Sequence, residues 1–214
     1  MAVRMLELFE HVEDDDAARM LAITGAGSAF CIGFDDAVDP RLVESLAVLS
    51  KPTVVIINGD AFDEGLELAM AADIRIAISS ARFAITQMKR GTMPHFGATQ
   101  RLPRLIGAAN ALRLMFTGTA LGAADALRTG LVTYLAGNPA DLATTGGRVA
   151  EAILSRAPLA ARLVKDAVLK GTDMTLDQGI RLEEDLYALL QTTSDRAEGV
   201  RAFLEKRKPL FRGA

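Results

Sequence analysis

The chain has 214 residues, 50% of them hydrophobic, and a formal net charge of −3. That length can bury a full-sized core, and the interspersed charges, with no stripe of basic side chains, argue against nucleic acid as a partner. The single cysteine, Cys31, excludes an internal disulfide, and no apolar segment approaches the ~20 residues of a membrane-spanning helix. We therefore expect a cytoplasmic protein without a signal peptide or membrane partner, folded as one domain plus an appendage.

The first 137 residues alternate between short apolar strands and helices. Strands are predicted over residues 20–24, 29–32, 53–57, 74–78, 81–84 and 131–135. Helical patterns cover residues 6–17, 42–49, 65–71, 99–115 and 123–127. This alternation of strand, turn and helix predicts an α/β core over residues 1–137.

After Asn138-Pro139 the pattern is helical throughout. Apolar residues recur at helical spacing in three segments, which are separated at Ala157-Pro158 and at Gly171. A leucine-rich helical region over residues 138–214 indicates an oligomer interface rather than a free-standing bundle.

The most informative stretch joins the strand at residues 53–57 to the next helix. Asn58-Gly59 ends the strand, and the carboxylates of Asp60, Asp63 and Glu64 precede that of Glu67. A helix that begins directly after a strand presents free N–H groups and the positive end of its dipole, which stabilise a developing anion. Because carboxylates beside such a spot can move protons, this turn is the first candidate site.

Five segments of the chain resemble a known family; they are residues 21–35, 51–73, 99–104, 114–118 and 203–209. Together, and in this order, they resemble the crotonase family, which contains the enoyl-CoA hydratases and isomerases. The resemblance implies a crotonase-like α/β spiral of ββα units, whose C-terminal helices build a homotrimer or a hexamer (a dimer of trimers). It also implies an acyl-CoA thioester substrate, with coenzyme A as part of the substrate and no separate cofactor or metal. The family's amino-terminal strands have no counterpart before Met1, so a shortened member is expected.

The resemblance assigns an oxyanion hole to two backbone N–H groups. By motif alignment these are the N–H groups of Phe34 and Glu64, which would hold the thioester oxygen. Phe34 stands where the family usually has alanine, and Asp63-Glu64 stands in its run of glycines, so an atypical site is expected. The resemblance also places five residues at the substrate or at coenzyme A, namely Ile32, Asp35, Asp63, Phe203 and Lys206. Phe203 and Lys206 would reach coenzyme A from a neighbouring subunit.

Three side chains are candidates for proton transfer. Glu67 aligns with one of the two hydratase glutamates, whereas Gln87 stands at the position of the other. Glutamine cannot accept and return a proton at neutral pH, so the standard two-glutamate hydration is not expected from this pair. His95, in Pro94-His95-Phe96-Gly97, occupies a position at the mouth of a helix where an imidazole could act as base or acid.

The sequence leaves two alternatives open. With one glutamate, one glutamine and a histidine, the enzyme could instead be a CoA-dependent isomerase or hydrolase that uses His95. The filled glycine run also fits a catalytically degenerate crotonase that serves as a binding or scaffold subunit.

Overall fold

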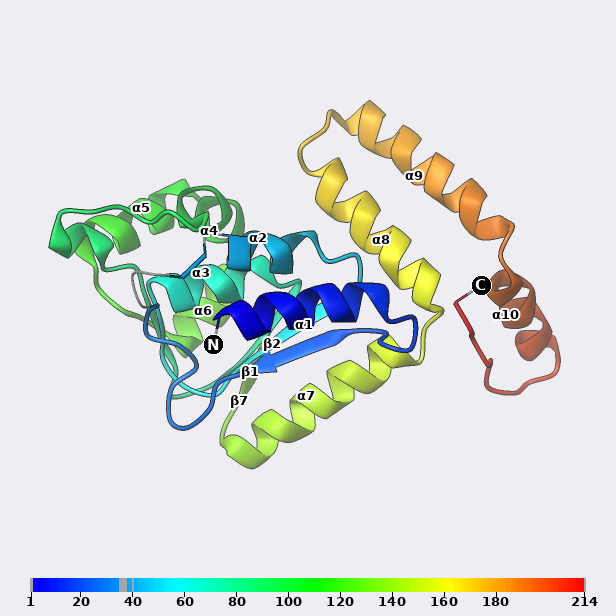
Figure 1. Cartoon of the computed structure of the whole chain (residues 1–214), viewed down its shortest axis with the longest axis horizontal. Coiled ribbons are helices and arrows are strands. Elements are labelled where there is room, and N and C mark those ends of the chain that lie inside the picture. Colours follow the sequence, from blue (N-terminus) through cyan, green and yellow to red (C-terminus); the bar gives the residue numbers. More distant parts are fainter. Residues whose placement is uncertain (1, 35–37, 40, 214) are drawn as a thin grey trace. The chain divides into compact units, whose positions relative to one another are not determined.

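The computed structural model describes residues 2–34, 38–39 and 41–213 (Figure 1). The chain divides into two compact units, one of residues 1–49 and 53–149 and one of residues 50–52 and 150–214. The first unit holds all the strands of the described part of the chain, and the second is helical.

A four-stranded parallel sheet forms the centre of the first unit. Its order is β1-β2-β4-β7, and the strands are β1 (Leu21–Thr24), β2 (Thr53–Ile57), β4 (Ile74–Ile78) and β7 (Tyr134–Ala136). The side chains of Val55, Ile57 and Ile76 are completely buried. Near-continuous apolar runs are typical of parallel strands covered on both faces, which is why the sequence predicts β2 and β4 with their observed bounds.

A second sheet of three short strands lies next to the candidate site. Its order is β3-β5-β6, where β3 (Ala61–Phe62) is parallel to β5 (Arg82–Ala84) and β5 is antiparallel to β6 (Leu121–Gly122). Strands of two residues leave no periodic pattern, so the sequence does not predict β3 or β6. The apolar piece at residues 29–32 is not a strand, and it contributes only an isolated bridge from Cys31 to Ala61.

Helices complete the first unit. They are α1 (Ala2–Asp14), α2 (Arg41–Val48), α3 (Glu64–Ala71), a 3₁₀ turn at Gln87–Arg90, α4 (Ala98–Ile106), α5 (Ala108–Thr117) and α6 (Ala123–Thr129). The helical pattern over residues 99–115 is divided, because Gly107 adopts φ 81° between α4 and α5. The last strand lies at residues 134–136 rather than 131–135.

The helices after residue 138 are α7 (Pro139–Leu154), α8 (Pro158–Gly171), α9 (Leu176–Gln191) and α10 (Ser194–Leu204). The predicted breaks at Ala157-Pro158 and Gly171 are confirmed, whereas the separate helix α10 is not predicted by the sequence. Helices α8 and α9 pack against each other as a hairpin (Figure 1). None of the helices in the described ranges is long and apolar enough to cross a bilayer.

We expect Gly65→Ala to destabilise the first unit, because α3 passes very close to the chain at Cys31. A Cβ atom on Gly65 would lie 2.1 Å from the Cys31 carbonyl oxygen. Relief of such an overlap costs about 1–3 kcal/mol of unfolding free energy, which urea denaturation measures. The control is Gly147→Ala in α7, where a Cβ meets no atom within 4 Å. An equal effect of both substitutions would contradict the close approach.

Candidate active site

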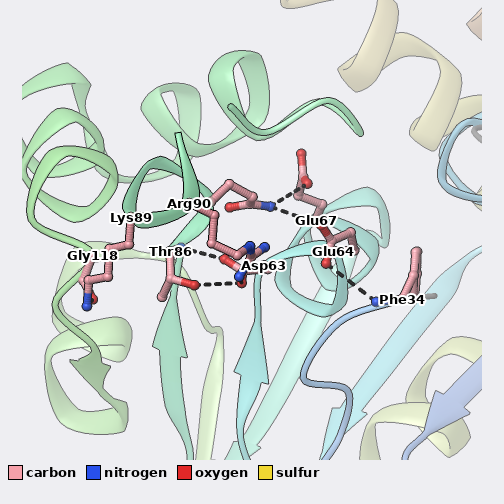
Figure 2. Close-up of polar contacts among 9 residues, drawn as sticks. Phe34, Asp63, Glu64, Glu67, Thr86, Lys89, Arg90 and Gly118 are labelled. Carbon is pink, nitrogen blue, oxygen red and sulfur yellow. Dashed lines mark hydrogen bonds and ion pairs between the residues drawn. The ribbon is translucent and has the colours of Figure 1, made fainter. Parts of the chain in front are cut away.

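The acidic turn places its side chains through an unusual backbone conformation at Asp63. This residue precedes α3 with φ 49° and ψ −121°, a region that is costly for any residue except glycine. Its N–H donates to the Ala84 carbonyl at 2.8 Å. Its carboxylate accepts from the Thr86 N–H, from the Thr86 hydroxyl at 2.7 Å and from Arg90 at 3.3 Å (Figure 2). These contacts offset the backbone strain and fix the start of α3.

Glu67 is the central carboxylate of the site. It is fully buried, and its Oε1 accepts hydrogen bonds from the N–H groups of Phe96 and Ala98, both at 2.9 Å. Burial raises the pKa of Glu67 above its ordinary value, and the neighbouring Glu64 charge adds to that rise. The two backbone hydrogen bonds and the proximity of His95 act in the opposite direction. Glu67 is therefore a buried carboxyl group held in one orientation, and burial keeps its pKa above the ordinary value.

The turn before α4 is shaped to hold this carboxylate. Gly97 adopts φ 104°, which lets the N–H groups on both sides of it point at one oxygen. Arg101 donates to the Phe96 carbonyl at 2.8 Å and so fixes the turn from the other side.

Gln87 lies between two carboxylates. The residue is 1% exposed, and its Nε2 donates to Glu64 Oε1 and to Glu67 Oε2, each at 3.4 Å. Its Oε1 is buried and has no hydrogen-bond partner among the described residues. Buried polar atoms are nearly always paired, so an unpaired acceptor at this place is unusual.

The two residues predicted to form the oxyanion hole are in contact through the side chain of Glu64. The Phe34 N–H donates to Glu64 Oε2 at 3.4 Å (Figure 2). Glu64 is the first residue of α3, so its own N–H has no acceptor within the helix. The contact is long compared with the usual 2.9–3.0 Å, which makes it weak and easily displaced.

His95 lies on the exposed side of the same region. Its ring centroid is 4.2 Å from that of Phe96, and Phe96 in turn packs edge-to-face against Phe34 at 5.6 Å. The imidazole is solvent-exposed, so it can exchange protons with water.

Of the remaining predicted substrate residues, Ile32 and Asp35 belong to the first unit, whereas Phe203 and Lys206 belong to the second. Ile32 is 65% exposed, and Asp35 lies outside the described residues. In the second unit, Phe203 is 82% exposed at the end of α10 and lines an apolar pocket of about 370 Å³ with Leu204 and Phe211. Lys206 follows α10 with φ 53° and is exposed. In the described ranges, no group of three or more His, Cys, Asp or Glu side chains could hold a metal ion.

The sequence does not reveal the residues that hold these side chains. Thr86 and Arg90, which bind Asp63, lie more than twenty positions away from it. The hydrogen bonds to Glu67 come from backbone groups, and these leave no trace in residue type. Gly97 is the exception: its residue type indicates the turn that holds Glu67, because a turn of this kind requires a positive φ.

Comparison with known proteins identifies the family. The whole chain, residues 1–214, matches the family model described as enoyl-CoA hydratase/isomerase. The chain belongs to this family, the crotonases. It is 38% identical to an (E)-benzylidenesuccinyl-CoA hydratase of Thauera aromatica, over 98% of this chain and 88% of the relative. It is 37% identical to a crotonyl-CoA hydratase of Syntrophomonas wolfei, over 94% of this chain and 83% of the relative.

The fold agrees with solved crotonase structures. An enoyl-CoA hydratase from Bacillus anthracis superimposes with a TM-score of 0.95 at 33% identity, covering 100% of this chain and 88% of that one. The predicted family and the predicted crotonase-like α/β fold are therefore confirmed, and the chain belongs to an enzyme family.

In this crotonase we expect Asp63→Ala to lower stability by about 1–3 kcal/mol, because it leaves the part-buried donors of Thr86 without their acceptor. Chemical denaturation measures the loss. The matched control is Asp166→Ala on α8, which removes an exposed ion pair with Lys170 and should cost at most about 0.5 kcal/mol. A loss at Asp63 no larger than this would show that its contacts do not hold the turn.

The raised pKa of Glu67 also predicts a dependence of stability on pH. Between the ordinary value of 4.5 and the raised value, the folded state binds more protons than the unfolded state. The stabilisation that the raised pKa of Glu67 contributes to the folded state is thus full below pH 4.5, and it is lost as the pH rises through the pKa of Glu67 in the folded state. Relative to Glu67→Gln, the wild type should lose unfolding free energy as the pH is raised from 4.5, measured by urea denaturation. A relative gain would mean that Glu67 is instead stabilised as an anion.

Proposed function

We propose that the protein is an enoyl-CoA hydratase or isomerase-type enzyme in which Glu67 transfers a proton to or from C2 of an acyl-CoA thioester. The observation that carries the proposal is the Glu67 carboxyl itself. It is completely buried and anchored at Oε1 by two backbone N–H groups, with Oε2 directed at Gln87. A buried carboxyl with a raised pKa, fixed in one orientation, suits general acid–base catalysis.

The thioester oxygen is held by the N–H groups of Phe34 and Glu64. Support comes from the Phe34 N–H, which donates to a carboxylate oxygen and is therefore directed at a negatively charged acceptor. The Glu64 N–H adds the positive end of α3. Preorganised donors of this kind stabilise the enolate that forms when C2 gains or loses a proton.

The other predicted residues keep supporting roles. His95 exchanges protons with solvent near Glu67, and Gln87 orients the reacting groups. Ile32, Asp35 and Asp63 border the thioester, whereas Phe203 and Lys206 bind the coenzyme A moiety of a neighbouring subunit's substrate. The enzyme needs no cofactor besides the coenzyme A of its substrate.

We also propose a homotrimer or a hexamer, located in the cytoplasm. The helical hairpin of α8 and α9 supports an assembly, because it exposes large apolar side chains, among them Val164, Val168, Leu176, Ile180 and Tyr187. The lone cysteine favours a reducing compartment.

One observation favours a second candidate, a binding or scaffold subunit without catalysis. The Glu64 carboxylate lies on the Phe34 N–H, where the thioester oxygen would bind. Calorimetric titration with acetyl-CoA separates the two functions, since a closed site would release no heat of binding. Product analysis on enoyl-CoA and β-ketoacyl-CoA substrates distinguishes a hydratase from an isomerase or hydrolase that uses His95.

The proposal predicts that Glu67→Gln lowers kcat on the best enoyl-CoA substrate by about 10²–10⁴-fold, with little change in KM, because general acid–base catalysis is lost. His95→Ala should reduce kcat less. The control is Glu151→Gln, an exposed carboxylate on α7, which should leave kcat unchanged. If Glu67→Gln and His95→Ala both kept wild-type turnover, the assigned roles would be wrong.

A further inference from the structure

The side chain of Glu64 points into the site rather than into solvent. Glu64 is half-buried, and its two carboxylate oxygens contact different groups of the site. Oε2 accepts from the Phe34 N–H at 3.4 Å (Figure 2). Oε1 accepts from Gln87 Nε2, also at 3.4 Å. A glutamate in the first turn of a helix is favoured there by the dipole alone, but the dipole does not explain why both oxygens face inward.

Gln87 connects this carboxylate to Glu67. The same Nε2 atom donates to Glu64 Oε1 and to Glu67 Oε2. In the structure the amide nitrogen, not the amide oxygen, lies between the two carboxyl groups. Two carboxylates therefore lie on either side of one amide group, although position 87 itself carries no carboxylate.

The unpartnered Gln87 Oε1 is the acceptor to which we assign a water molecule in the substrate-bound site. This oxygen is buried, accepts from no group of the described chain, and belongs to the amide that contacts Glu64. A water molecule could donate one hydrogen to this oxygen and the other to the Glu64 carboxylate. Such a water would have its oxygen lone pair available for attack.

We propose that the Glu64 side chain is the second proton-transferring group of this site and activates the water that adds to the enoyl thioester. The proposal rests on the function proposed above and extends it from proton transfer at C2 to hydration. Because its contact with the Phe34 N–H is long, the arriving thioester oxygen replaces Glu64 there. The Glu64 carboxylate then remains beside Gln87, and its backbone N–H keeps its separate role toward the thioester oxygen.

The reaction balances with these two groups. The Glu64 carboxylate takes a proton from water as the water oxygen bonds to C3 of the enoyl thioester. The C2–C3 π electrons move to the thioester oxygen, and the enolate then takes a proton at C2 from protonated Glu67. After product release Glu64 loses its proton to solvent and Glu67 regains one, so each turnover adds one water molecule.

Two assays on the full-length protein test this division of roles. The first follows hydration of an enoyl-CoA, and the second follows exchange of the C2 hydrogen of a saturated acyl-CoA with D₂O. Glu64→Gln keeps the backbone N–H and the side-chain shape, and we expect it to lower the hydration kcat by about 10²–10⁴-fold while C2 exchange falls far less. Glu67→Gln should lose both reactions, and the control Glu151→Gln should lose neither.

Three results would overturn the proposal for Glu64. The first is hydration at the wild-type rate by Glu64→Gln, and the second is faster hydration by Glu64→Gly, which would show that the carboxylate only obstructs the site. A wild type that exchanges C2 hydrogen but hydrates no enoyl-CoA would also overturn it, while leaving the proposed function intact. Undiminished exchange by Glu67→Gln would instead contradict the proposed function. If circular dichroism shows that Glu64→Gln does not fold, Glu64→Gly replaces it in the hydration assay. The proposal then predicts that Glu64→Gly loses hydration.

Discussion

A buried carboxylate must be compensated, and for Glu67 the compensation comes from the backbone of the turn before α4. The N–H groups of Phe96 and Ala98 bind the same oxygen, and the positive φ of Gly97 lets them converge. Arg101 fixes the turn through the Phe96 carbonyl. This interaction ties α3, which carries Glu67, to the turn before α4, and Gln87 Nε2 donates to the other oxygen of the same carboxyl group. The free energy of burying a charge without partners would otherwise exclude a glutamate here.

The acidic turn divides into residues with different physical roles. Asp63 adopts a glycine-like conformation, and hydrogen bonds from Thr86 and Arg90 offset its strain. Its carboxylate holds the turn that precedes α3. Because Asp63 sets the direction in which α3 begins, the next residue, Glu64, directs its side chain at Phe34 and Gln87. A departure from the glycines of the family thus changes the chemistry available to the site as well as its shape.

The sequence predicts the family, the fold and the long strands because these depend on pattern. The buried apolar runs of β2 and β4 and the break at Gly171 are examples. It does not predict β3 and β6, which consist of two residues each, or the end of α4 at Gly107. In the site, motif position identifies Glu67, Gln87 and Glu64, whereas the direction of the Glu64 carboxylate depends on the backbone at Asp63. The strain at Asp63 and the contacts of Thr86 involve residues far apart in the chain, and single-residue patterns do not encode them.

In the proposed complex the Phe34 and Glu64 N–H groups receive the thioester oxygen, while the Glu64 carboxylate leaves the Phe34 N–H and remains beside Gln87. A crystal structure with a bound, unreactive acyl-CoA tests this most directly. We predict a thioester oxygen within about 3 Å of both nitrogens and the Glu64 carboxylate withdrawn from Phe34. A bound thioester whose oxygen lies elsewhere, with Glu64 still on the Phe34 N–H, would contradict the claim.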